Sequence, residues 1–161
     1  MMQKALGRDL MILIRRAGLL GATFALAWLA GCGGGSGGSG GGAGSGRNAY
    51  VALPQANAIA AFRVNSSGDL SRVLGSPFAG GTSPVAIAVH PSGKFVYAAN
   101  QGGNDVSLFT INSNTGELTE VMPRTAAGLN PSSLVMDSGG DLLFVTNETA
   151  NTISGYSVSS S

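Results

Sequence analysis

The side chains in this sequence that could do acid–base chemistry are few and lie far apart. His90 is the only histidine. To act as a general base it would need a nucleophile and an orienting partner nearby. Two carboxylates, Asp137 and Glu148, are the other candidate catalytic residues. Each has a structural alternative, because His90 could bond the turn that follows it and Glu148 could be a solvated turn carboxylate.

The only cysteine, Cys32, follows an apolar N-terminal run that has basic residues before it. The run, residues 17–30, is shorter than the roughly 20 residues that span a bilayer. Residues 1–31 therefore predict a signal peptide, read from either Met1 or Met11. Its last residues, Leu-Ala-Gly-Cys, resemble a bacterial lipobox. The resemblance implies a lipid anchor at Cys32 and a place in the bacterial cell envelope; the alternative is a plain secretory signal.

Residues 32–47 hold this cysteine and a flexible linker rich in glycine and serine. A linker of this length has an r.m.s. span of roughly 20 Å, enough to hold a domain away from lipid headgroups. From residue 32 onward, seven acidic and five basic side chains give a net charge of −2. The sequence has no basic patch with interleaved aromatic residues, so we expect no nucleic-acid partner. It also has no Cys/His cluster with metal spacing, and we expect neither metal nor cofactor.

A repeat of about 47 residues must position the candidate side chains. Residues that agree across this offset are Pro84 with Pro131, Gly93 with Gly140, Tyr97 with Phe144, Asn100 with Asn147, and Asn104 with Asn151. The same offset backward gives Tyr50, Asn57, Ile59 and Phe62. In this alignment Asp137 corresponds to His90, whereas Glu148 has no acidic counterpart. The recurring Asn100 and Asn147 are expected to bond backbone groups at a turn.

The central unit predicts four short strands, separated by turn residues, at 84–90, 95–99, 106–111 and 118–122. Both faces of these strands carry apolar or small residues, which favours a sheet packed between two others. A four-stranded antiparallel meander repeated at this period is typical of a β-propeller blade; an open solenoid is the alternative. We therefore predict an all-β chain with about two and a half blades. These are a partial blade at 48–83, a blade at 84–130 and a partial blade at 131–161.

Two segments of the repeat are similar to a known signature. Phe95–Asn100 and Leu143–Asn147 resemble the YVTN propeller repeat, and residues 130–148 look like a blade of the lactonase family of seven-bladed propellers. The resemblance covers nearly all of residues 48–161. It implies a relationship to 6-phosphogluconolactonase-like enzymes, which hydrolyse a lactone ester. It assigns no catalytic residue, because every blade carries the signature.

About two and a half blades do not close a ring, since propellers have typically four to eight. We expect the chain to be an N-terminal fragment of a longer propeller; assembly of several chains is the alternative. By itself the chain is expected to be inactive. Two functions follow for the complete protein. One is an exported, lipid-anchored lactone hydrolase, and the other is a non-catalytic propeller that binds a small molecule, glycan or envelope protein.

Overall fold

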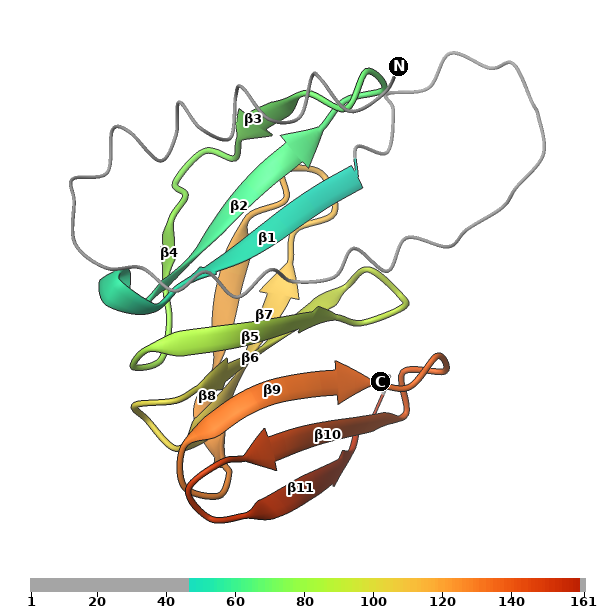
Figure 1. Cartoon of the computed structure of the whole chain (residues 1–161). Helices are drawn as coiled ribbons and strands as arrows, with labels where there is room; N and C mark the ends of the chain where they lie inside the picture. Colours follow the sequence, from blue (N-terminus) through green and yellow to red (C-terminus); the bar gives the residue numbers. More distant parts are fainter. Residues whose placement is uncertain (1–46, 160–161) are drawn as a thin grey trace, which may run out of the picture.

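The computed structural model describes residues 47–159, which form three antiparallel sheets stacked one on another (Figure 1). The first sheet holds β1 (Arg47–Leu53), β2 (Ala58–Val64), β3 (Leu70–Arg72) and β4 (Phe78–Ala79), with a single 3₁₀ turn, η1 (Pro54–Ala56), between β1 and β2. The second holds β5 (Pro84–Val89), β6 (Phe95–Asn100), β7 (Asp105–Ile111) and β8 (Leu118–Ala126). The third holds β9 (Pro131–Met136), β10 (Leu142–Asn147) and β11 (Thr152–Ser157).

The expected signal peptide, Cys32 and nearly all of the expected linker lie outside the described residues. Arg47, which we assigned to the linker, is the first residue of β1 and pairs with Val64. The all-β fold class predicted from the repeat is confirmed. Among residues 47–159 no helix is long and apolar enough to cross a membrane.

Each sheet is a meander, because short turns join strands that are neighbours in sequence. In the second sheet the order is β5-β6-β7-β8, as the sequence predicts. The turn between β5 and β6 needs a left-handed residue, and Gly93 supplies it with φ 69°. Gly140 takes the same conformation, φ 86°, at the equivalent turn of the third sheet. The turn chemistry of the repeat is therefore retained between sheets.

The outermost strand differs from the expectation, because it is interrupted halfway along its length. In the first sheet β3 and β4 both pair with β2, and residues 73–77 detour between them. The Oγ of Ser76 accepts a hydrogen bond from the N–H of Ala61 at 2.9 Å, which replaces the missing strand partner. In the second sheet β8 bulges at the same repeat position and continues to Ala126, past the expected end at 122. Pro123 lies in this bulge, where its lack of an N–H costs no ladder bond.

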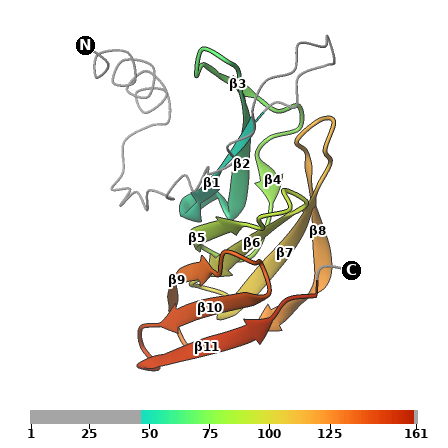
Figure 2. The same ribbon diagram turned by 90° about the vertical axis from the view of Figure 1, so that its right-hand side faces the viewer.

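The hydrophobic core lies between the sheets rather than inside any one of them. Tyr50 and Ile59 of the first sheet pack against one face of the second, where Phe109 is fully buried. The other face of the second sheet packs against the third, with Tyr97 contributing from β6 and Val145 from β10. Both faces of the central sheet are thus covered, as the apolar pattern predicts; the turned view in Figure 2 shows it lying between its two neighbours.

An asparagine in left-handed conformation fixes each connection between sheets. Asn57, Asn104 and Asn151 occur at one repeat position and have φ values of 50°, 56° and 51°. The Oδ1 of Asn57 accepts a hydrogen bond from the N–H of Ser83 at 2.8 Å, and the Oδ1 of Asn104 accepts one from the N–H of Asn130 at 2.7 Å. Each bond spans 26 residues and joins one sheet to the strand that begins the next.

A glycine and a buried asparagine pack together beside each of these connections. The side chain of Asn100 lies directly against Gly81, and that of Asn147 lies against Gly128, so that a Cβ on Gly128 would be 2.6 Å from Cγ of Asn147. Asn100 and Asn147 are 0% and 1% exposed. The N–H of Gly128 donates to Oδ1 of Asn147 at 3.1 Å. Only glycine allows the connection to approach the asparagine this closely.

We expect Gly81→Ala to destabilise the fold by about 1–3 kcal/mol, because the added methyl group must displace a fully buried amide. The measurement is urea unfolding of the 161-residue chain. Gly155→Ala is the matched control, since its added Cβ would be 3.4 Å from the Phe144 ring, an ordinary contact. Equal unfolding midpoints for Gly81→Ala and the native chain would show that this packing is loose.

Candidate functional site

The structure places the three candidate catalytic residues at opposite edges of the sheets. His90 follows the end of β5, and Asp137 follows the end of β9, the equivalent strand. Glu148 follows β10, which runs antiparallel to β9. A strand of six residues is roughly 20 Å long. Glu148 is therefore about one strand length from the edge that carries His90 and Asp137, and the three do not form one site.

His90 is buried between the second and third sheets, with both ring nitrogens hydrogen-bonded. Its Nδ1 accepts from the N–H of Ser92 at 3.0 Å and lies 2.8 Å from the Oγ of the same serine. Because Nδ1 is an acceptor, the proton is on Nε2, which donates to the carbonyl of Gly140 at 3.1 Å. The ring also meets Phe95 edge to face, with centroids 5.8 Å apart. His90 thus bonds its own turn and links two sheets.

Asp137 makes the same kind of contact in the third sheet. Its Oδ1 accepts from the N–H of Leu142 at 2.8 Å, and its Oδ2 accepts from the N–H of Gly139 at 3.2 Å. These backbone donors, led by that of Leu142, hold the pKa of Asp137 below its usual range. The carboxylate therefore stays ionised and caps its turn. His90 and Asp137 share a structural role at one repeat position; a catalytic role for either stays a prediction.

Glu148 lies at the other edge, beside a shallow hollow on the third sheet. Its side chain is exposed, and its backbone N–H donates to the carbonyl of Asn130 at 2.9 Å. The hollow is lined by Ser132, Thr146, Asn147, Glu148, Asn151, Thr152 and Ile153. Glu148 is the only acid among these lining residues. Of the three candidates, it is the one whose side chain is free to contact a ligand.

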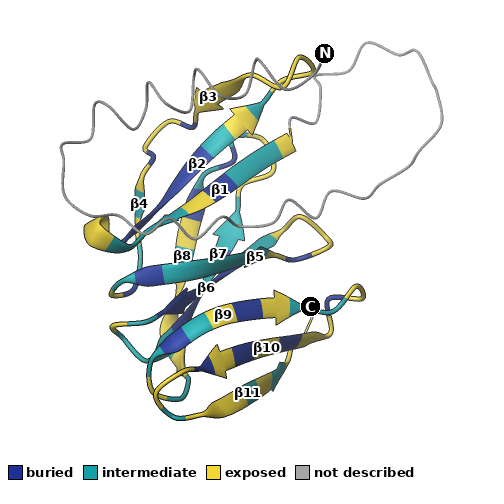
Figure 3. Ribbon diagram, in the orientation of Figure 1, coloured by how far each residue is buried: buried dark blue, intermediate teal, exposed yellow. Residues whose placement is uncertain are grey.

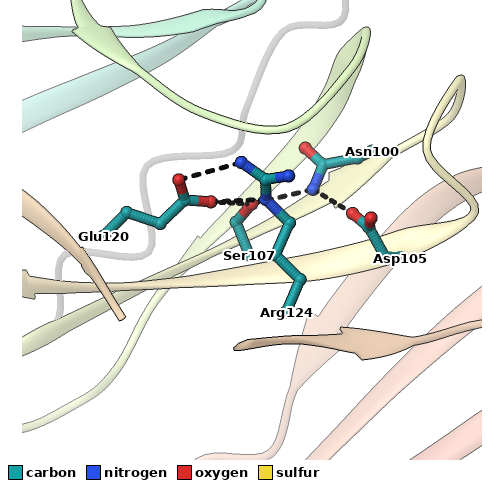
Figure 4. Close-up of polar contacts among 5 residues, drawn as sticks. All are labelled: Asn100, Asp105, Ser107, Glu120 and Arg124. Atoms are coloured by element: carbon teal, nitrogen blue, oxygen red, sulfur yellow. Dashed lines mark hydrogen bonds and ion pairs between the residues drawn. The ribbon is translucent and has the colours of Figure 1, made fainter. Parts of the chain in front are cut away.

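A polar network that the sequence did not predict joins three strands of the second sheet (Figure 4). The Nδ2 of Asn100 donates to Oδ1 of Asp105 at 2.6 Å and to Oγ of Ser107 at 2.8 Å. Ser107 donates in turn to Oε1 of Glu120 at 2.7 Å. Arg124 forms a two-pronged ion pair with Glu120, at 2.7 and 3.0 Å. The chain of bonds runs from a fully buried amide on β6 to a partly exposed guanidinium on β8.

Part of this network recurs in the third sheet and is absent from the first. The Nδ2 of Asn147 donates to Thr152 at 3.2 Å and to Ser154 at 2.9 Å. The corresponding positions of the first sheet hold only apolar side chains, namely Leu53, Ala58 and Ala60. Ser107 is 0% exposed, so no substrate reaches its hydroxyl. We therefore assign the network to structure rather than to catalysis.

Within this network the charge of Glu120 is paired with that of Arg124. Burial opposes ionisation of Glu120, but hydrogen bonds from Arg124 and Ser107 and the charge of Arg124 outweigh it, so the pKa of Glu120 is lowered. The bond to Glu120 raises the pKa of Arg124 further. Among residues 47–159 no three His, Cys, Asp or Glu side chains come close enough to hold a metal ion.

Three stacked antiparallel meanders are the arrangement expected of neighbouring propeller blades, and one propeller family matches this sequence. The sequence model of the lactonases with a seven-bladed β-propeller matches residues 43–161. The chain belongs to this lactonase family. No curated protein matches the sequence closely enough to add to this assignment.

Solved structures share the fold of this lactonase-family chain. A protein from Bacteroides fragilis with a provisional assignment as a 6-phosphogluconolactonase is 23% identical to this chain, with a TM-score of 0.61. The match covers 70% of this chain and 32% of that one. A provisionally assigned 6-phosphogluconolactonase from Bacteroides uniformis is 15% identical with a TM-score of 0.62, over 73% and 38%. The periplasmic gluconolactonase PpgL of Pseudomonas aeruginosa is 19% identical with a TM-score of 0.61, over 70% and 33%. The chain thus spans about a third of the length of these structures.

Replacing Glu120 by Gln should remove the charge of the network while keeping its shape. Because the pKa of Glu120 is lowered by folding, its ionised form stabilises the protein above the ordinary value of 4.5. That contribution is lost as the pH falls through the lowered pKa. We expect Glu120→Gln to cost about 1 kcal/mol at pH 7 and distinctly less at pH 3, which lies below the ordinary value of 4.5.

The measurement is urea unfolding of both proteins across this pH range. Glu148→Gln is the control, because it removes the same charge from an exposed side chain that has no side-chain partner among residues 47–159. A cost for Glu120→Gln that is as large at pH 3 as at pH 7 would rule out the ion pair as its source.

Proposed function

We propose that this chain is the membrane-anchored part of a lactonase-family propeller in the bacterial cell envelope, and that the closed ring hydrolyses a lactone ester. The observation that carries the proposal is the family match, which extends over residues 43–161. One relative of the same fold is a gluconolactonase of the periplasm, which agrees with an exported enzyme of this class. The substrate class follows from the family, and no described residue selects between individual lactones.

The N-terminal sequence supports the anchor. A lipidated Cys32 would carry more than one acyl chain, and two chains give stable membrane attachment where a single chain gives only marginal binding. The glycine-rich linker then separates the first sheet from the headgroups by roughly 20 Å. A sugar lactone in the envelope would reach a propeller tethered in this way without crossing the inner membrane.

Lactone hydrolysis requires little of the protein beyond a general base and a hydrogen-bond donor to the carbonyl oxygen. Water adds to the ester carbonyl carbon, the bond from that carbon to the ring oxygen breaks, and the ring oxygen takes a proton to give a hydroxy acid. An exposed carboxylate such as Glu148, which lines the hollow of the third sheet, can take the proton from water, and an N–H group beside it can donate to the carbonyl oxygen.

A second function has an observation in its favour. The only histidine uses both ring nitrogens for structural bonds, and the most buried hydroxyl of the polar network is closed to solvent. The described blades therefore hold no assembled base and nucleophile. This favours the alternative of a non-catalytic propeller that binds a small molecule, a glycan or an envelope protein through the sheet edge that carries Glu148.

The anchor is tested by replacing Cys32 with Ser. When the chain is expressed in a bacterium, we expect the native protein in the membrane fraction and labelled by radioactive palmitate. The Cys32→Ser protein should lose the label and leave the membrane fraction, because the serine hydroxyl does not accept the lipid. Equal membrane fractions and equal label for both proteins would eliminate the lipobox interpretation.

The enzymatic proposal is tested by following δ-gluconolactone and its 6-phosphate in a pH-stat. The 161-residue chain as a monomer should match the buffer rate, because its ring is open. A closed ring, whether an assembly or a longer product of the same gene, should exceed that rate at least tenfold. If a closed ring opens neither lactone, the binding alternative stands. A monomer well above the buffer rate would instead place the chemistry within the described blades, with Glu148→Gln as the first variant to assay.

A further inference from the structure

The outer face of the third sheet is apolar and uncovered. We use this name for the side of β9, β10 and β11 that points away from the second sheet. Val135, Phe144 and Ile153 are 61%, 41% and 70% exposed on it. None of them belongs to either hydrophobic cluster of the described residues. In Figure 3 the central strand of this sheet, β10, shows exposed residues alternating with buried ones, which marks a sheet packed on one side only.

The equivalent faces of the other two sheets are buried. Phe144 corresponds to Tyr50 and Tyr97, which are 6% and 8% exposed. Ile153 corresponds to Ile59 and Val106, at 0% and 4%. In both earlier sheets this face is covered by the following sheet. The outer face of the third sheet therefore has the residue types of a sheet-to-sheet contact.

The edge of this face also has an unused hydrogen-bond acceptor. Asn57 and Asn104 each accept a backbone N–H through the side chain. Asn151 has the same left-handed conformation, with φ 51°, but its side-chain amide has no partner among residues 47–159. It lines the shallow hollow together with Ile153. A backbone donor is the group that this position receives in the other two sheets, so the missing occupant is a polypeptide.

The first sheet carries the complementary face. Ala49, Val51 and Phe62 correspond to Val96, Ala98 and Phe109, which are at most 1% exposed in the second sheet. In the first sheet Val51 is 37% exposed, and Ala49 and Phe62 are half-buried. Neither hydrophobic cluster includes these three residues. One chain therefore presents both halves of a contact that it makes twice internally.

We propose that a second copy of this chain docks its first sheet on the outer face of the third sheet, head to tail. The contact repeats the packing between the first and second sheets and between the second and third. Each chain contributes three sheets, so two copies give about six blades, within the range of four to eight but one fewer than the seven of the family. Because the two faces differ, the interface is heterologous and closes only if the rotation per sheet allows it. This inference does not rest on the enzymatic proposal.

The mass of the 161-residue chain in solution tests the docking. Cys32→Ser serves as the background, because it removes the anchor and the only thiol. By size exclusion with light scattering at micromolar concentration, we expect twice the monomer mass or more. Phe144→Ser with Ile153→Ser should give the monomer. Both positions are exposed in the single chain, so the fold should survive, as unfolding by urea will verify.

Leu74→Ser is the matched control, since Leu74 is 83% exposed but lies in the connection between β3 and β4. It should assemble like the background protein. A monomeric background protein overturns the proposal and leaves a further blade of a longer chain as the occupant. An assembly that the Phe144/Ile153 variant retains overturns it as well.

A disulfide cross-link tests the orientation. Phe144→Cys and Ala49→Cys are made separately in the Cys32→Ser background, mixed, and treated with an added oxidant. Head-to-tail docking predicts that the mixed dimer exceeds either homodimer at least fivefold. A dominant Phe144→Cys homodimer would mean that two third sheets meet face to face, which overturns the arrangement proposed here.

Discussion

The sheets of this protein depend on packing face to face against one another. The strands alternate between two apolar sides, so a sheet alone would leave both in water. Burial of large side chains such as Ile59, Phe109 and Val145, all at 0% exposure, supplies about 1.5–3 kcal/mol each. That gain is made only between sheets. Packing between neighbours, more than pairing within a sheet, is therefore the interaction on which the fold and its candidate site depend.

Polar contacts decide how the sheets are placed relative to one another. The left-handed asparagines hold each connection close to the sheet before it, and the glycine–asparagine pairs hold it close to the sheet after it. His90 performs a similar task at the opposite edge, where it reaches the backbone of Gly140. Because these bonds act at the two edges, they set the spacing of the sheets without interrupting the apolar contact between them. The Oδ1 of Asn100 is a buried polar atom that takes no part in these contacts, because it has no hydrogen-bond partner among the described residues.

Much of the fold could be predicted from sequence, because the 47-residue offset fixes strand order and turn positions together. The alignment of His90 with Asp137 also anticipated their shared place at a turn. The Ser107–Glu120–Arg124 network could not be predicted, since it needs the pairing of β7 with β8 and the bulge around Pro123. A signal existed: Asn100, Asp105 and Ser107 repeat as Asn147, Thr152 and Ser154. Polar residues at alternate strand positions indicate a buried network only once the facing sheet is known.

The stacking of sheets, each touching only its neighbours, also makes stability a local property. In such a one-dimensional array the free energy is roughly a sum of units and of nearest-neighbour interfaces. The second sheet has two interfaces, whereas the first and third have one each. Within residues 47–159, opening should therefore cost most at β6 and β7, whose sheet has a neighbour on both sides. The hollow beside Glu148 lies on the third sheet, and so the described surface best placed to meet a ligand belongs to a sheet that, within residues 47–159, is held by a single interface.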